Sequence, residues 1–186
     1  MFMWIIVAIA VMFILWIISA YNGLVSLKNQ TLNGWKQIDV QLKRRHDLIP
    51  NLVETVKGAM KFEQVTLTQV IEARNRAISA QGVADKAVQE NALTGALRQL
   101  FALTENYPDL KSNANVAKLQ EELSSTENRI GFARQFYNDI ATKFNIAQAT
   151  FPTNIIAGAF GFKPGELFEI TASQEREAPK VDLNIK

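Results

Sequence analysis

The first charged side chain in this sequence is Lys28, and every residue from Met1 to Ile18 is apolar. An α-helix rises about 1.5 Å per residue, so about 20 apolar residues cross a hydrocarbon core of roughly 30 Å. The start of the chain supplies them, with Ser19 as the polar exception. We therefore predict a transmembrane anchor over residues 1–21 and a lipid bilayer as the first partner of this protein.

A cleaved signal peptide is the alternative interpretation, because the small residue Ala20 could precede a cut before Tyr21. Signal peptides carry a basic N-terminal region and an apolar core of about 7–15 residues. This stretch has no basic residue and a longer core. Trp4 and Trp16 also resemble the aromatic residues that lie at membrane interfaces. Together these features favour a transmembrane anchor that is not cleaved from the protein.

The two flanks of the anchor differ in basic residues. None precedes it, whereas Lys28 and Lys36 follow it, and Lys43, Arg44 and Arg45 come soon after. Flanks rich in lysine and arginine tend to stay in the cytoplasm. We therefore expect a single-pass protein of the inner (cytoplasmic) membrane, with its N-terminus outside and its body in the cytoplasm.

Composition narrows the function of the remaining chain. The 20 basic and 18 acidic residues give a net charge of +2 and are scattered, which argues against nucleic-acid binding. The absence of cysteine removes disulfides, thiolate metal sites and cysteine nucleophiles, and a single histidine makes a zinc site improbable. Because no catalytic, cofactor-binding or metal-binding pattern stands out, we expect neither an enzyme nor a cofactor.

Apolar periodicity predicts an all-α fold, since prolines are few and no strand alternation is found. Four amphipathic helices are predicted, over residues 22–42, about 47–82, about 85–106 and about 112–150. The third is expected to bury Val88, Ala92, Ala96 and Leu100. The fourth carries a seven-residue apolar repeat from Val116 to Ala147, typical of a left-handed coiled-coil seam. Short connections then predict a long antiparallel four-helix bundle over residues 22–150.

Four glycines fall inside these predicted helices, namely Gly34, Gly58, Gly95 and Gly131. A glycine in a helix interior lowers stability by roughly 1 kcal/mol relative to alanine. Either neighbouring helix backbones approach each other closely at these glycines, or the protein simply tolerates glycine there. The residues alone leave both alternatives open.

A basic cluster lies between the first two predicted helices. Asp47 can cap the second helix and Pro50 suits its first turn, so a solvated turn is predicted at residues 43–47. The simplest interpretation is a polar loop. Cations near a helix N-terminus could also bind a phosphate or an acidic partner. The candidate partner contact consists of Lys43, Arg44, Arg45 and His46.

A second polar group is expected to form ion pairs between helices. Glu127 and Arg134 are seven residues apart and share one side of the fourth predicted helix, where both could bridge to a neighbouring helix. Such pairs favour one helix register more than they add stability. The candidate structural ion pairs involve Glu72, Arg74, Glu127, Arg129 and Arg134.

Residues 151–170 crowd apolar side chains into a segment too short to span a membrane. If the bundle runs up and down twice, this segment emerges beside the bilayer. It could cap the open end of the bundle, lie in the membrane interface or pack on another subunit. The candidate contact residues are Phe151, Ile155, Ile156, Phe160, Phe162 and Phe168. Residues 171–186 are charged and poor in apolar side chains, so we expect a flexible tail.

Longer motifs resemble those of a known protein family. The sequence reads NGWKQIDVQLKRR at residues 33–45, HDLIPNLVETVKG at residues 46–58, LQEEL at residues 119–123 and ENRI at residues 127–130. These motifs, and others between residues 21 and 169, resemble the LemA family. The resemblance implies a single N-terminal transmembrane helix followed by a long antiparallel helical bundle. It also implies no established enzymatic activity, and either a structural, membrane-organising role or an adaptor role beside membrane peptidases.

Two functions are therefore expected. The first is a non-catalytic scaffold that self-assembles as a homo-oligomer. The fourth predicted helix is about 57 Å long against about 33 Å for the third, and the excess needs covering. The alternative is an adaptor that binds a membrane peptidase or sensor through the predicted turn at Arg44 and Arg45.

Overall fold

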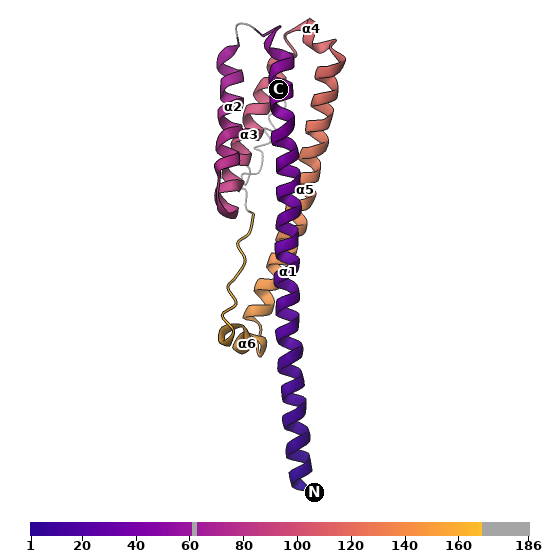
Figure 1. Cartoon of the computed structure of the whole chain (residues 1–186), viewed down its shortest axis with the longest axis vertical. Helices are drawn as coiled ribbons and strands as arrows, with labels where there is room; N and C mark the ends of the chain where they lie inside the picture. The colour runs from indigo at the N-terminus through magenta and orange to yellow at the C-terminus, as the bar shows by residue number, and fades with distance from the viewer. Residues whose placement is uncertain (61–62, 169–186) are drawn as a thin grey trace, which may run out of the picture.

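The computed structural model describes residues 1–60 and 63–168. Its helices are α1 (Phe2–Lys57), α2 (Gln64–Ser79), α3 (Gly82–Thr104), α4 (Pro108–Lys111), α5 (Ala114–Ala149) and α6 (Thr153–Ala159). The described ranges contain no strand, so the all-α prediction is confirmed there. Figure 1 shows that α1 is much longer than its neighbours and projects beyond them at its N-terminal end. The predicted tail at residues 171–186 lies outside the described residues.

The projecting part of α1 is a candidate membrane anchor. Residues 1–15 are exposed, and an 18-residue window of this helix has a mean hydropathy of 2.8 with none of it buried in the protein. By length and composition this helix can cross a membrane. The prediction of an apolar N-terminal helix is therefore confirmed.

Helix α5 packs along α1 over most of the length of α5 (Figure 1). Near the anchor, Leu24 of α1 packs with Phe144 of α5, and at the far end Ile49 and Leu123 share one apolar core. The side of α5 that faces α1 follows the predicted repeat: its buried residues include Val116, Leu123, Thr126, Ile130, Ala133, Tyr137, Ile140 and Phe144. The heptad pattern thus identified the packed face of α5 correctly.

The backbones of α1 and α5 approach each other closely at Gly34. A Cβ atom placed on this residue would lie 3.4 Å from the Cα atom of Tyr137 and 3.6 Å from its Cβ atom. Larger side chains at this position would push the two helices apart. Gly58, Gly95 and Gly131 face open space, so close approach explains Gly34 and simple tolerance explains the other three.

Helices α2 and α3 form a hairpin against the half of the α1 and α5 pair that is farther from the anchor (Figure 1). The nearer half of the pair is covered by residues 160–168, which we call the strap. The strap follows α6 and packs Phe168 against Ile38, Trp35 and Tyr137. The extra length of α5 is therefore covered partly by its own chain, which weakens the expectation that a second subunit must cover it.

Two asparagines of α5 hold the strap. The side chain of Asn145 donates to the carbonyl of Gly165 at 2.9 Å and accepts from its N–H at 2.8 Å. Asn138 makes the same pair of bonds with Phe168, at 3.1 Å and 2.8 Å. Seven helical residues cover about 10.5 Å and three residues of extended chain about 10 Å, so the two spacings match. Each amide side chain thus provides hydrogen-bond partners for the backbone N–H and carbonyl of a strap residue, which lies outside any helix.

Tyr137 adds a fifth hydrogen bond to the strap. Its hydroxyl donates to the carbonyl oxygen of Glu166 at 2.7 Å. Burial, and next the negative charge of Glu166, raise the pKa of Tyr137 above its usual value. The hydroxyl therefore stays protonated and remains a donor at neutral pH.

The predicted turn at residues 43–47 is wrong. Helix α1 continues through this stretch and through Pro50 to Lys57, and α2 begins only at Gln64. Asp47 therefore caps no helix, and Pro50 lies inside one. Helix α1 ends at Lys57 and α2 begins at Gln64, both at the end of the body that lies farthest from the anchor (Figure 1).

The predicted buried face of the third helix is wrong in part, since Leu100 is buried as expected but the other three residues are not. In α3, Val88 and Ala92 are exposed. The buried residues are Ala87, Glu90, Leu93, Leu97, Leu100 and Thr104. The helix is thus rotated so that a carboxylate points into the interior, because that carboxylate finds partners on α1.

Candidate functional site

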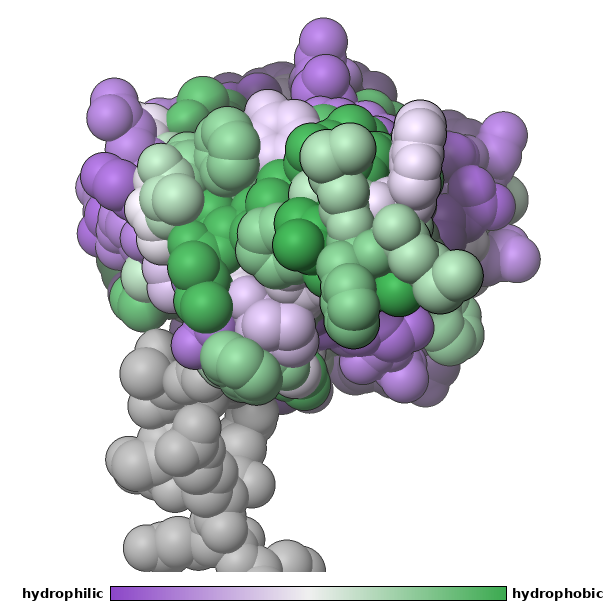
Figure 2. Space-filling model, turned by 90° about the horizontal axis from the view of Figure 1, so that it is seen from below, coloured by the Kyte–Doolittle hydropathy of each residue, from purple (hydrophilic) through white to green (hydrophobic). Residues whose placement is uncertain are grey.

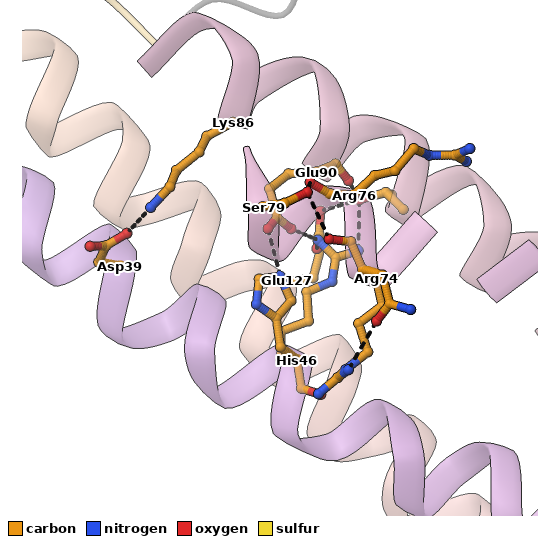
Figure 3. Close-up of polar contacts among 11 residues, drawn as sticks. Asp39, His46, Arg74, Arg76, Ser79, Lys86, Glu90 and Glu127 are labelled. Carbon is orange, nitrogen blue, oxygen red and sulfur yellow. Dashed lines mark hydrogen bonds and ion pairs between the residues drawn. The ribbon is translucent and has the colours of Figure 1, made fainter. Parts of the chain in front are cut away.

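Glu90 lies at the centre of a polar cluster enclosed between α1, α3 and α5 (Figure 3). Its side chain is 0% exposed. One carboxylate oxygen, Oε2, lies 3.3 Å from Arg45 Nη1, and the other, Oε1, lies 2.7 Å from His46 Nε2. A carboxylate can be buried in this way only when both oxygens are paired. Two adjacent residues of α1 provide that pairing.

Arg45 connects all three helices. It is 2% exposed, and besides Glu90 it reaches Glu127 of α5, whose Oε2 lies 3.0 Å from its Nη1. Its Nη2 donates to Thr94 of α3 at 2.7 Å. The guanidinium fork thus faces two carboxylates and a hydroxyl at once, which is the geometry that arginine provides and lysine does not.

Arg74 joins α2 to the same region of α1. Pro50 has no N–H, so the carbonyl of His46, four residues earlier, loses its helical partner. The Nε of Arg74 donates to that carbonyl oxygen at 2.7 Å (Figure 3). A side chain of a neighbouring helix therefore supplies the hydrogen bond that proline removes, and this allows α1 to continue past Pro50.

Arg134 lies on α5 beside this cluster. Its guanidinium carbon is 4.4 Å from the ring centroid of Phe168, the last residue of the strap. Burial lowers the pKa of Arg134, Glu127 and Glu90 act in the opposite direction, and Arg45 adds to the lowering. Its Nε and Nη2 atoms are buried without a hydrogen-bond partner among the described residues. Stacking on the aromatic ring is the contact that the structure shows for this cation.

The cluster joins three helices through paired charges. Both oxygens of Glu90 are occupied, and the groups around it alternate in charge. No group of three or more potential metal ligands occurs in residues 1–60 and 63–168. Ion pairs that join residues of three helices around a buried carboxylate can form in one helix register only, so their clearest physical role is to select that register.

The sequence-predicted polar residues lie in different environments. Arg45 and His46 are buried in the cluster, whereas Lys43 and Arg44 are exposed on α1. The four therefore do not form one surface. Among the expected ion-pair residues, Glu127 faces Arg45, Arg74 binds a carbonyl and Arg134 stacks on Phe168. Glu72 and Arg129 are exposed on α2 and α5.

The residues of the apolar C-terminal segment divide into two groups. Ile156 is buried with Leu24 and Phe144, and Phe162 packs against the same core. Phe168 of the strap is buried against α1 and α5. Phe151, Ile155 and Phe160 are exposed. Phe160 contacts Tyr21 of α1, with ring centroids 4.7 Å apart. The segment therefore both closes one end of the body and exposes apolar side chains there.

A groove of about 530 Å³ runs between α1 and α5 at the level of Val40 and Phe136. Its lining residues are Lys36, Gln37, Val40, Gln41, Arg129, Phe132, Ala133 and Phe136. Phe132 is 73% exposed, and Val40 and Phe136 are exposed too. Sequence reasoning missed this groove, although two phenylalanines one helical turn apart, next to the predicted seam, were the available signal.

Sequence reasoning also missed Glu90 and Thr94. The signal was present, since Glu90 lies at helical spacing from Ala87, Leu93 and Leu97. A charged residue in such a stripe needs a partner of opposite charge, and that partner is 45 residues away in the sequence. Periodicity alone therefore favoured a different face of this helix, the one that contains Val88 and Ala92 and has no charged residue.

Comparison with known proteins supports the resemblance found in the motifs. Protein LemA of Metamycoplasma hominis is 28% identical over 167 residues, which cover 88% of this chain and 73% of the relative. Magnetosome protein MamQ 2 of Paramagnetospirillum magneticum is 27% identical over 185 residues, covering 86% and 68%. MamQ of Magnetospirillum gryphiswaldense is 24% identical, covering 85% and 68%. The model of the LemA family matches residues 34–183, and this chain therefore belongs to the LemA family.

Proposed function

We propose that this protein is a membrane-anchored, non-catalytic scaffold that self-assembles through the groove between α1 and α5. In this proposal α1, α2, α3 and α5 form an antiparallel four-helix bundle. The N-terminus lies outside the inner membrane and the bundle lies in the cytoplasm, as the basic residues after the anchor favour. The bundle is the rigid unit that is repeated in the assembly.

The uncovered groove is the observation that carries this proposal. Helices α2 and α3 and the strap cover one side of the α1 and α5 pair. On the groove side, Phe132, Phe136 and Val40 are exposed, with Lys36 and Arg129 beside them. Exposed aromatic residues next to arginine are typical of the central residues of protein interfaces.

A second copy of this chain is the occupant that the anchor favours. Copies anchored in one membrane by the same N-terminal helix stand in the same orientation, with their grooves at the same height. A two-fold axis along the membrane normal then brings identical patches together, as closed dimers require. Confinement to the membrane plane also raises the local concentration of potential partners.

The buried cluster supports a structural rather than a catalytic role. A scaffold needs one fixed shape, and pairing of Arg45 with Glu90 and Glu127 disfavours other helix registers. The same pairing leaves no carboxylate oxygen of Glu90 available for acid or base chemistry.

Replacing Phe132 and Phe136 by serine is expected to weaken self-association without unfolding the protein. Phe132 is 73% exposed and Phe136 is 45% exposed in the single chain, so their loss removes few contacts inside the body. Two aromatic interface residues contribute about 2–4 kcal/mol together, which makes association roughly 30- to 1000-fold weaker. Light scattering of the detergent-purified full chain across micromolar concentrations measures this change.

The control is Val65→Ser, on α2 and 70% exposed, which removes a comparably exposed apolar residue away from the groove. It should leave the mass unchanged. Two outcomes would contradict the proposal: a wild-type chain that stays monomeric throughout, or a Val65→Ser variant that dissociates as readily as the double variant.

An adaptor remains the second candidate function, with a smaller contact than the sequence suggested. Lys43 lines a hollow of about 320 Å³ together with Ile78 and Lys86, and an acidic, partly apolar segment would fit there. Arg45 is excluded from such a contact by burial. Reversing the charge of Lys43 and Arg44 separates the two functions. An adaptor would lose a co-purified partner and keep its own assembly, whereas a scaffold would change in neither respect.

A further inference from the structure

Three large apolar side chains around α6 are exposed to the surroundings of the body. They are Phe151, which is 75% exposed, Ile155 and Phe160. Their neighbours Ile156 and Ala157 are buried against Leu24 and Phe144, so α6 is held firmly in place. Seen from the anchor end, the molecule exposes a broad apolar surface (Figure 2). Exposed apolar side chains that cluster in this way mark a site of contact.

The height of α6 along α1 matches the edge of the bilayer. About 20 residues of helix span roughly 30 Å of hydrocarbon. The uninterrupted apolar stretch of α1 ends at Ile18 and is followed by Ser19, Tyr21 and Asn22, so α1 leaves the hydrocarbon close to Tyr21. Tyrosine is enriched at that boundary. The ring of Tyr21 lies 4.7 Å from that of Phe160 and 5.9 Å from that of Phe162. The residues around α6 therefore lie in the layer where α1 emerges.

The charges near α6 suit a lipid surface. Between residues 19 and 35 of α1 the charged residue is Lys28, and between residues 140 and 165 the charged residues are Lys143 and Lys163. All three lysines are exposed, and neither range contains an acidic residue. Lysines just outside the hydrocarbon attract anionic headgroups by about 1 kcal/mol each at low ionic strength. A patch with apolar side chains beside lysines has the composition of a helix that lies in a membrane interface.

We propose that α6 and its flanking phenylalanines form a second membrane contact, inserted into the interface of the bilayer that α1 crosses. Phe151, Ile155 and Phe160 lie among the outer acyl chains, and Lys28, Lys143 and Lys163 meet anionic headgroups. Two contacts, one at α1 and one at α6, fix the tilt and the rotation of the body relative to the membrane. This contact does not depend on self-assembly, and it would exist in a monomer.

A fluorescent probe at position 155 tests the insertion directly. The chain has no cysteine, so Ile155→Cys in the full chain carries one label, and Val65→Cys on α2 is an exposure-matched control. Both are reconstituted into vesicles of phosphatidylcholine and phosphatidylglycerol that contain spin-labelled lipid. We expect a blue-shifted, strongly quenched probe at position 155 and an unquenched probe at position 65. Equal quenching at the two positions, or none at position 155, would overturn the proposal.

Dilution with lipid separates a bilayer contact from a contact with another copy. Quenching by lipid should stay constant when the lipid-to-protein ratio is raised tenfold. If the probe is instead shielded from lipid in dense vesicles and becomes exposed to water on dilution, the patch is a subunit contact and the proposal is wrong. A failure of the Phe132 and Phe136 experiment has no effect on this result.

The lysines are tested by lipid composition. Quenching at position 155 should be stronger in vesicles with phosphatidylglycerol than in pure phosphatidylcholine. Replacing Lys28, Lys143 and Lys163 by glutamine should abolish this difference and leave the anchor in place. If the labelled chain that retains all three lysines is quenched equally in both kinds of vesicle, the proposed contact between these lysines and anionic headgroups is wrong.

Discussion

Replacing Arg45 by methionine is expected to lower the free energy of unfolding of the body by about 3–5 kcal/mol. The substitution leaves the carboxylate of Glu90, which is 0% exposed, without its charged partner. His46 still faces one oxygen, but the other oxygen and the neighbouring Glu127 lose the guanidinium. Urea unfolding of the full chain in detergent, followed by circular dichroism, measures the change.

Two further variants give this prediction its controls. Arg44→Met changes the adjacent, exposed arginine and should change stability by less than about 0.5 kcal/mol. Arg45→Met combined with Glu90→Leu removes both charges and should recover at least half of the loss, because an apolar pair is tolerated where a lone buried charge is not. Two results would show that Arg45 and Glu90 are not coupled. One is an Arg45→Met variant that loses no more stability than Arg44→Met, and the other is a double variant whose loss equals the sum of the two single losses.

Replacing Arg74 by methionine should lower the free energy of unfolding by about 1–3 kcal/mol, because the carbonyl of His46 then has no donor. The cause of this dependence is Pro50, which cannot donate to that carbonyl. In a Pro50→Ala background the alanine N–H restores the helical hydrogen bond. Arg74→Met should then lower stability by only a few tenths of a kcal/mol.

The two substitutions therefore form a double-mutant cycle with a coupling energy of about 1 kcal/mol or more. Arg76→Met on the same helix, which removes an exposed arginine, controls for the loss of a cation and should show no coupling to Pro50. Equal losses from Arg74→Met with proline and with alanine at position 50 would mean that the arginine does not compensate for the proline.

Local patterns in the sequence predicted the parts of the fold in which burial is purely apolar. The face of α5 from Val116 to Phe144 was visible because every buried position there is apolar or small, so the repeat was uninterrupted. The anchor was visible for the same reason. These elements depend on hydrophobic periodicity alone, which is a property of neighbouring residues.

The region around Pro50 could not be predicted in this way. Asp47 followed by Pro50 is a normal start for a helix, and the local signals agreed with each other. The deciding interaction comes from Arg74, which lies 28 residues after His46, whose carbonyl it binds. A contact between distant residues thus overrode a valid local signal. The first predicted helix and the beginning of the second are both part of α1, and the rest of the second is α2.

The buried face of α3 failed for a related reason. The sequence around α3 favours burying the face that contains Val88, because the alternative face would bury the charge of Glu90 without a partner. Arg45 and His46 change that balance. They were singled out from the sequence for their charge and were assigned to a surface turn, whereas they form the interior polar contact of the body.

Cross-linking of neighbouring copies in a membrane tests the central claim, self-assembly through the groove between α1 and α5, most directly. Because the chain lacks cysteine, Gln37→Cys places one thiol in the groove and Val65→Cys places one on α2. The full chains are reconstituted into vesicles and treated with a short bis-maleimide. We expect covalent dimers from Gln37→Cys, their loss when Phe132 and Phe136 are also replaced by serine, and monomers from Val65→Cys. No dimer from Gln37→Cys, or equal dimers from both positions, would contradict the account.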